Sequence, residues 1–193
     1  MTMLFSDTLR TNRAQQIINA IDAAATAGTL PIYSGGQPDK GRDVSAISPY
    51  ATSTAYTAGD YVTASGHYYR ADNTGTSAAS APTWPTNGTT VADNDIVWQD
   101  MGLIPVLLGT MIFSKPCGTV TDGLLTFAAI TDDDEADASG TATWARALDG
   151  DGNFVIDGDC GGLGSGAFVE LNTVDIVAGG PLRATSAAIL EAA

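Results

Sequence analysis

The spacing of apolar positions changes near Gly28, which divides an expected helix from a series of expected strands. Between Ser6 and Ala27, apolar residues recur every three or four positions, as on one face of an amphipathic helix. These residues are Ala14, Ile17, Ile18, Ile21, Ala24 and Ala25. Ser6 or Asp7 can cap the start of this helix, and Gly28 is suited to its end. We expect the apolar face to pack on its own domain or, alternatively, to dock on a neighbouring subunit.

After Gly28 the pattern is typical of short strands separated by turns rich in Gly, Asp, Asn and Pro. Some runs alternate, so that Leu125, Phe127 and Ala129 fall on one face of a strand. The expected strands of this part are 30–34, 106–114, 124–130, 141–148, 154–159, 167–172, 174–177 and 182–190. Many short strands at close spacing predict a mainly β fold, with an antiparallel β-sandwich or barrel body and one N-terminal helix.

Aromatic residues mark a second region between Val44 and Gly102. It holds five of the six tyrosines and two of the three tryptophans, whereas all five phenylalanines lie outside it. Strands are expected at 60–64, 67–71 and 95–99, with Ser65-Gly66 as a two-residue hairpin turn between the first two. The sequence therefore predicts a small three-stranded β module at 44–102, inserted in a loop of a body formed by 1–43 and 103–193.

The charge balance excludes several classes of function. The chain has 193 residues with 22 acidic and 8 basic side chains, for a formal net charge of −14. Nucleic-acid binding rests on Lys and Arg that neutralise phosphates, so we expect none, nor docking on an anionic membrane. No signal peptide and no transmembrane run are expected. Cys117 and Cys160 are too few for a disulfide framework; reduced thiols are the expectation, although a single pair remains open.

Candidate catalytic chemistry is sparse. His67 is the single histidine and has no second histidine with which to build a zinc site. No strained nucleophile turn lies near it in sequence, and no phosphate-binding glycine motif occurs. We expect His67 to be a cross-strand surface residue beside Tyr68. The sequence thus predicts no catalytic residues, no cofactor and no metal site.

Two acidic clusters are candidates for metal or catalytic sites. The first comprises Asp132, Asp133, Asp134, Glu135 and Asp137; the second comprises Asp149, Asp151, Asn153, Asp157 and Asp159. The second begins like a calcium loop, but Phe154 replaces the sharp-turn glycine and Cys160 replaces the closing glutamate. We interpret Asp149–Asn153 as a hairpin turn and the first cluster as a solvated loop.

The body resembles small virion structural proteins of tailed bacteriophages. The segments that carry this resemblance are SDTLRTNRAQQIINAIDAAATAGTLPIYSG (6–35), LLGTMIFSKP (107–116), GLLTFAAI (123–130), SGTATWARALDGDGNFVIDGDCG (139–161) and NTVDIVAGGPLRATSAAIL (172–190). The resemblance implies a head decoration, or cement, protein on the capsid exterior, synthesised in the host cytoplasm. It would bridge subunits of the major capsid protein, with the homotrimer as the expected assembly.

The inserted module is similar to the small aromatic modules of chitin-binding type. The segments AYTAGDYVTASGHYYRADNTGTSAASAPTWP (55–85) and DNDIVWQD (93–100) carry this similarity. It implies that exposed rings stack on sugar faces, with Tyr56, Tyr68 and Trp84 as the candidates. Tyr61 and Trp98 lie at mid-strand and are expected in the core, since a small module also needs aromatics for its own packing.

Three functions remain open at this point. The first is the cement protein, with the module as an outward spacer or knob. The second is a tail- or fibre-associated adhesion protein that binds host surface glycans through the module. The third, an enzyme that acts on bacterial glycans, lacks a catalytic constellation in the sequence.

Overall fold

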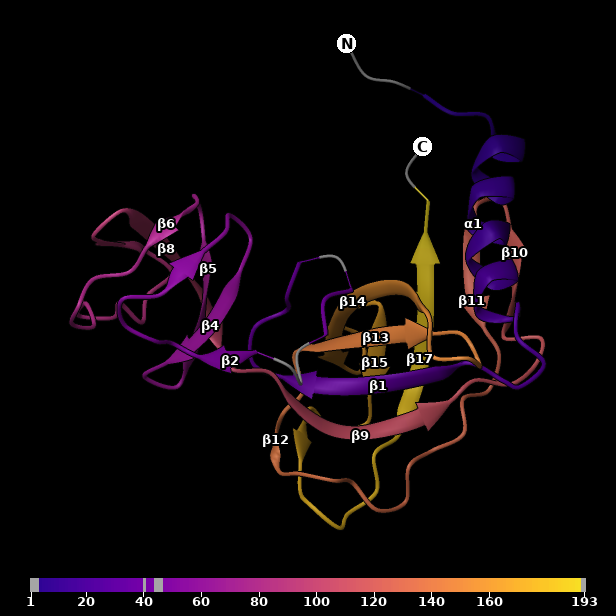
Figure 1. The fold of residues 1–193 in the computed structure, drawn as a ribbon. Coiled ribbons are helices and arrows are strands. Elements are labelled where there is room, and N and C mark those ends of the chain that lie inside the picture. Colours follow the sequence, from indigo (N-terminus) through magenta and orange to yellow (C-terminus); the bar gives the residue numbers. More distant parts are fainter. Residues whose placement is uncertain (1–3, 40, 44–46, 192–193) are drawn as a thin grey trace. The chain divides into compact units, whose positions relative to one another are not determined.

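The computed structural model describes residues 4–39, 41–43 and 47–191. The chain forms two compact units, which we call the body (Met1–Ser34 and Val106–Ala193) and the aromatic unit (Gly35–Pro105). The aromatic unit is wider than the range 44–102 expected from the sequence, and Val44 lies outside the described residues. The expected fold class is confirmed, because the protein is mainly β with one N-terminal helix and a large curled sheet (Figure 1).

The helix α1 (Asp7–Ile21) packs on the body. Ser6 caps its start, since the Ser6 hydroxyl accepts a hydrogen bond from the N–H of Leu9 at 3.3 Å. Ala14, Ile18 and Ile21 are buried and belong to the body's hydrophobic core. These three residues of the apolar face are therefore covered by the helix's own domain, as the first of the two expectations has it. Within the described residues no helix has the length and apolar character needed to cross a membrane.

The helix ends at Ile21, well before the expected end at Ala27. The ammonium group of Lys115 donates hydrogen bonds to the carbonyls of Asp22, at 2.8 Å, and Ala24. The Asp22 carboxylate in turn accepts a bond from the N–H of Cys117 at 3.1 Å. These partners come from a segment distant in the sequence, so helical spacing alone could not reveal this earlier end.

Eight strands of the body form one sheet. Their spatial order is β10 (Gly118–Thr121), β11 (Leu124–Phe127), β17 (Ala184–Leu190), β15 (Val169–Leu171), β14 (Phe154–Gly162), β13 (Trp144–Leu148), β1 (Thr29–Ser34) and β9 (Val106–Ile112). All neighbours are antiparallel except β14 and β15. The short strands β12 (Gly140–Thr141) and β16 (Asp175–Ile176) form a separate pair. The edge strand β10 was not expected from the sequence, because its four residues show little apolar alternation.

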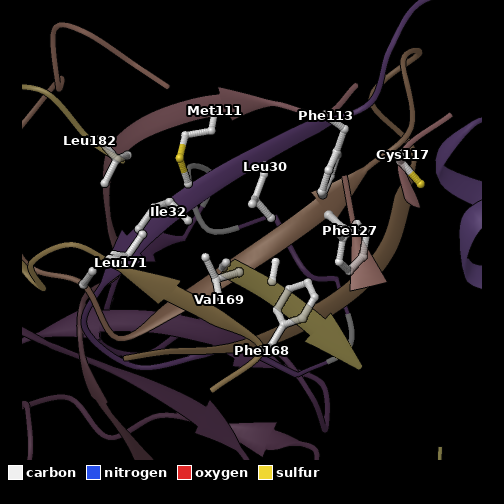
Figure 2. Close-up of a cluster of buried hydrophobic side chains, with 14 of the residues drawn as sticks. Leu30, Ile32, Met111, Phe113, Cys117, Phe127, Phe168, Val169, Leu171 and Leu182 are labelled. Atoms are coloured by element: carbon white, nitrogen blue, oxygen red, sulfur yellow. The ribbon is translucent and has the colours of Figure 1, made fainter. Parts of the chain in front are cut away.

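The inner face of this sheet carries the body's core. Figure 2 shows aliphatic, phenylalanine and sulfur-containing side chains from several strands gathered in one cluster. Leu30 and Ile32 of β1, Met111 of β9, and Val169 and Leu171 of β15 are all fully buried. Burial alternates along β11 as expected, with Leu125 inside and Leu124 exposed. This packing follows from the pleat, which sends successive side chains to opposite faces.

The free edge of β9 is covered by the segment 131–138. Ile112 of β9 forms a bridge with Thr131, and the N–H of Asp137 donates to the carbonyl of Leu108 at 2.8 Å. The same segment bridges on to Leu182, just before β17, through Asp133. The segment thus links β9, at one end of the strand order, to strands near the other end, and it gives the body a barrel-like curl. An edge covered in this way is not open to pairing with other chains.

The aromatic unit contains a second sheet. Its strand order is β2 (Ser48–Pro49), β4 (Tyr61–Ala64), β5 (His67–Ala71), β8 (Ile96–Leu103) and β7 (Thr90–Asp93), and β3 (Ala55–Tyr56) pairs separately with β6 (Gly75–Thr76). The strands β4, β5 and β8 correspond to the three expected from the sequence; β2 and β7 extend the sheet. Ser65 and Gly66 both have positive φ, 49° and 77°, as the tight hairpin turn between β4 and β5 requires.

Candidate functional site

Five aromatic rings meet on one side of the sheet in the aromatic unit. We call these rings the aromatic cluster: Tyr50, Tyr56, Tyr69, Trp84 and Trp98. The ring centroids of Tyr69 and Trp84 lie 4.4 Å apart, and those of Tyr56 and Trp98 lie 4.9 Å apart and nearly perpendicular. Tyr50 contacts Trp84 edge to face at 5.0 Å. Edge-to-face ring pairs are a favoured geometry, so the cluster stabilises the unit beyond the area it buries.

A buried carboxylate holds the cluster together from within. Asp93 is only 3% exposed, and its Oδ2 accepts hydrogen bonds from the Tyr50 hydroxyl and the Trp98 indole N–H, each at 3.0 Å. Its Oδ1 accepts a third bond from the N–H of Ala78 at 3.0 Å. Burial, together with the bond to Asp93, raises the pKa of Tyr50 above its usual range. A buried charge is tolerated where its oxygens are satisfied in this way.

Two of the three residues expected to stack on sugars, Tyr56 and Trp84, belong to the aromatic cluster. Both are half-buried, as is Tyr50, whereas Tyr69 and Trp98 are fully buried. The Tyr56 hydroxyl is bonded to the backbone of Ala51, whose N–H donates to it at 2.9 Å. Part of the surface of Tyr50, Tyr56 and Trp84 therefore stays open to solvent, and these three rings are the candidate sugar-binding surface.

The third candidate, Tyr68, is fully buried, so its expected role as an exposed stacking ring is wrong. Its ring stacks on that of Tyr61 at 5.8 Å, and a Cβ at Gly36 would come within 3.0 Å of its hydroxyl. Burial raises the pKa of Tyr68. Tyr61 and Trp98 lie in the core, as expected, with exposed fractions of 9% and 0%.

His67 is not the surface residue expected from the sequence. Its Nδ1 lies 2.8 Å from Oδ1 of Asp100, and the side chains are 13% and 0% exposed. Asp100 also accepts bonds from the N–H groups of Gly88 and Gly102, both at 2.9 Å. Burial alone would raise the pKa of Asp100, but these three bonds together hold it below its usual range. Asp100 thereby fastens the loop that follows Trp84 to the β5–β8 ladder.

The acidic cluster at 132–137 lies in the segment that covers β9. One carboxylate oxygen of Asp133 accepts from the N–H of Thr110 at 2.8 Å, and the other accepts from the N–H of Glu135 at 3.1 Å. A Cβ on Gly109 would stand 2.6 Å from the Asp133 carboxylate, so this close approach requires glycine. Asp133 therefore has a structural role at the sheet edge.

The second acidic cluster begins with the expected hairpin turn between β13 and β14. Asp149 accepts bonds from the side-chain amide of Asn153 at 2.9 Å and from the N–H groups of Asn153 and Asp151 at 2.8 and 2.9 Å. These bonds, led by that of the Asn153 side chain, hold the pKa of Asp149 below its usual range. The carboxylate closes the turn, as short polar side chains do at tight turns.

A buried ion pair in the body was missed by the sequence reasoning. Arg146 and Asp157 face each other across β13 and β14, with Nε–Oδ1 at 2.7 Å and Nη2–Oδ2 at 2.9 Å. Their side chains are only 7% and 5% exposed. The guanidinium also lies over the rings of Trp144 and Phe154, at 5.2 and 5.4 Å from their centroids. Two parallel bonds and two aromatic contacts make this a strong pairing.

Both cysteines are free thiols in the structure. Cys117 is buried beside Asp22, and Cys160 is half-buried beside Asp159. Burial raises the pKa of each thiol to about 12, with a smaller contribution from the neighbouring carboxylate. Both therefore stay protonated at neutral pH, which makes them poor nucleophiles.

Among the residues that the structure describes, no three His, Cys, Asp or Glu side chains come together as metal ligands. The candidate functional groups among these residues are therefore carboxylates with structural roles and a half-exposed group of aromatic rings. No family model, no curated protein and no solved structure matches this chain.

Proposed function

We propose that the protein is a non-enzymatic structural protein of a tailed-bacteriophage virion. In this proposal it decorates the head as a homotrimeric cement protein that bridges subunits of the major capsid protein, and the aromatic unit is displayed outward. The segments of the body quoted above carry the resemblance on which the virion assignment rests.

An exposed pair of leucines on the body is the observation that carries the proposal. Leu124 of β11 and Leu190 of β17 are register partners, so their side chains lie next to each other on one face of the sheet. They are 40% and 67% exposed, while Leu125 in the next position is fully buried. An apolar pair that faces solvent can be buried against another protein, which would remove its area from water.

The use of the acidic residues supports a non-enzymatic role. Asp93, Asp100, Asp133, Asp149 and Asp157 all accept hydrogen bonds from the protein's own backbone or side chains. Carboxylates that accept such bonds stabilise the folded structure. The remaining negative charge suits docking on basic capsid surfaces and repels packaged DNA.

The test is to locate the chain in particles propagated from the genome that encodes it, by quantitative mass spectrometry and cryo-electron microscopy. Hundreds of copies on the head would support the proposal, and absence from the particle would end it. Leu124→Asp should lower binding to capsids, whereas Val177→Asp should not. Val177 is a matched control because it is also apolar and is 68% exposed.

The half-exposed rings favour a second candidate, an adhesion protein on the tail or fibre. Tyr50, Tyr56 and Trp84 present partly open aromatic surface on a rigid cluster, which is the kind of surface on which sugar rings stack. A glycan array with the Trp84→Ala variant tests this function, with Val97→Ala as the control. Glycan binding that is lost only in Trp84→Ala, in a folded protein, would favour adhesion, as would a handful of copies on the tail.

A further inference from the structure

The wall of the body contains an uncharged slot between β11 and β17. The two strands are paired from Leu124↔Leu190 to Thr126↔Ala188 and then separate. They are joined again only at the bridge between Asp133 and Leu182. A cavity of about 420 Å³ lies between these two closures, lined by residues 126–130 and 184–188. We call this cavity the slot.

The slot has the chemistry of a site for an extended peptide. Its lining contains no charged residue, although the chain as a whole carries −14. Phe127 and Ala187 are the buried members of its lining. On its rim, neither Ala129 nor Ile130 has a backbone hydrogen bond to any residue that the structure describes. Unpaired peptide groups beside an apolar floor suit another peptide chain, which can supply both backbone bonds and apolar side chains.

The sequence before α1 contains a segment that, like the lining of the slot, has no charged side chain. Residues 1–5 read Met-Thr-Met-Leu-Phe and have no charged side chain. Leu4 is 79% exposed, the highest value among the exposed large apolar residues, so its own copy does not cover it. The chain is extended at Ser6, directly before α1 begins at Asp7. Leu4 and Phe5 therefore precede the helix, and Leu4 is left largely uncovered by the residues of its own copy that the structure describes.

We propose that residues 1–5 of one copy occupy the slot of a second copy. The exchange deepens the proposed function, on which it rests, because it names the contact that would hold the copies of the homotrimer together. The contact is heterologous, since one copy gives the segment and the next gives the slot, and such contacts form a ring when the rotation between successive copies closes, here after three copies. The high negative charge favours this arrangement, because copies of a −14 chain repel each other except where their surfaces are uncharged.

Sedimentation equilibrium of the full chain over a range of concentrations, without capsids, tests the exchange. Leu4→Asp removes the apolar anchor, and Ala129→Arg places a charge on the slot's rim. Each should raise the dissociation constant for self-association by about tenfold or more. Leu163→Asp is the matched control, because Leu163 is 77% exposed on the loop after β14, and its constant should stay unchanged.

The exchange would be overturned by a wild-type chain that stays monomeric at the highest concentration. It would also be overturned if all three variants weakened self-association equally, or if Ala129→Arg alone weakened it. Circular dichroism melts establish that each variant is folded. A disulfide formed only when Leu4→Cys and Ala129→Cys copies are mixed, in a Cys160→Ser background, would support it directly. A chain that exchanges segments but is absent from virions would overturn the proposed function and leave the exchange standing.

Discussion

The body and the aromatic unit use different means to build a stable core. The body buries aliphatic and phenylalanine side chains such as Leu30, Met111 and Phe127 across an eight-stranded sheet. The aromatic unit relies on tyrosine and tryptophan rings around the buried carboxylate of Asp93. A small unit encloses little volume, and each large ring buries much area while its polar group needs a partner. The difference shows that the partition of aromatic types along the chain reflects two separate ways of packing.

The largest effect is expected from removing the central ring of the aromatic unit. Trp98→Ala deletes a fully buried indole and leaves Asp93 without one of its donors, which should cost about 3–5 kcal/mol. Differential scanning calorimetry should show a lower melting temperature for the aromatic unit and an unchanged transition for the body. Val97→Ala, at the neighbouring and exposed position, is the control. A matching shift in both transitions would show that the two cores are not separate.

A comparable loss of stability in the body is expected when one partner of its buried ion pair is removed. Asp157→Ala leaves the Arg146 charge buried without its carboxylate, a change that costs about 3–5 kcal/mol in buried pairs. Differential scanning calorimetry should report it as a lower melting temperature of the body. The double variant Arg146→Met/Asp157→Leu removes both charges and should recover most of the loss. If the double variant is as unstable as the single one, the cost lies in packing and not in the unpaired charge.

Deleting the aromatic unit should have a smaller effect on the body. Joining Ser34 to Val106 through a short glycine linker leaves every strand of the body's sheet in place. Loop-closure entropy changes slowly with loop length, by about 0.6 kcal/mol per doubling, so the body should still melt cooperatively. Calorimetry and far-ultraviolet circular dichroism measure this outcome. Aggregation or a broad transition would contradict the separation of the two units.

The smallest effect is expected from mild acid. The pKa values of Asp39, Asp100, Asp149 and Glu170 are all lowered in the folded protein. A carboxyl whose folded pKa is lowered stabilises the fold above its unfolded value, near 4, and this stability is lost as the pH falls through the folded pKa. Denaturation midpoints should therefore stay level from pH 7 to about pH 5 and decline below pH 4. Asp100→Asn should weaken this decline for the aromatic unit, where Asp100 lies.

Some features depended on register, which the sequence did not reveal. The turn at Asp149–Asn153 was predicted, and Leu148 faces Phe154 across it. Counting back from that pair would put Arg146 opposite Ile156. A shift between Ala147 and Leu148 puts it opposite Asp157 instead and so creates the buried ion pair. A one-residue irregularity of this kind leaves no signal in the hydrophobic pattern.

The sequence alone predicts the fold class, the start of α1, the Ser65-Gly66 hairpin and the division between aliphatic and aromatic cores. These features depend on the spacing and composition of residues within short segments, so no contact between distant parts of the chain is needed to predict them. Three features depend instead on contacts between distant segments: the burial of Tyr68, the His67–Asp100 pair and the early end of α1. Neighbouring residues on a strand point to opposite faces, so alternation predicts that Tyr68 is exposed if Tyr69 is buried. Both are buried because Trp84 packs on one and Tyr61 on the other, and these partners approach only when the chain has folded.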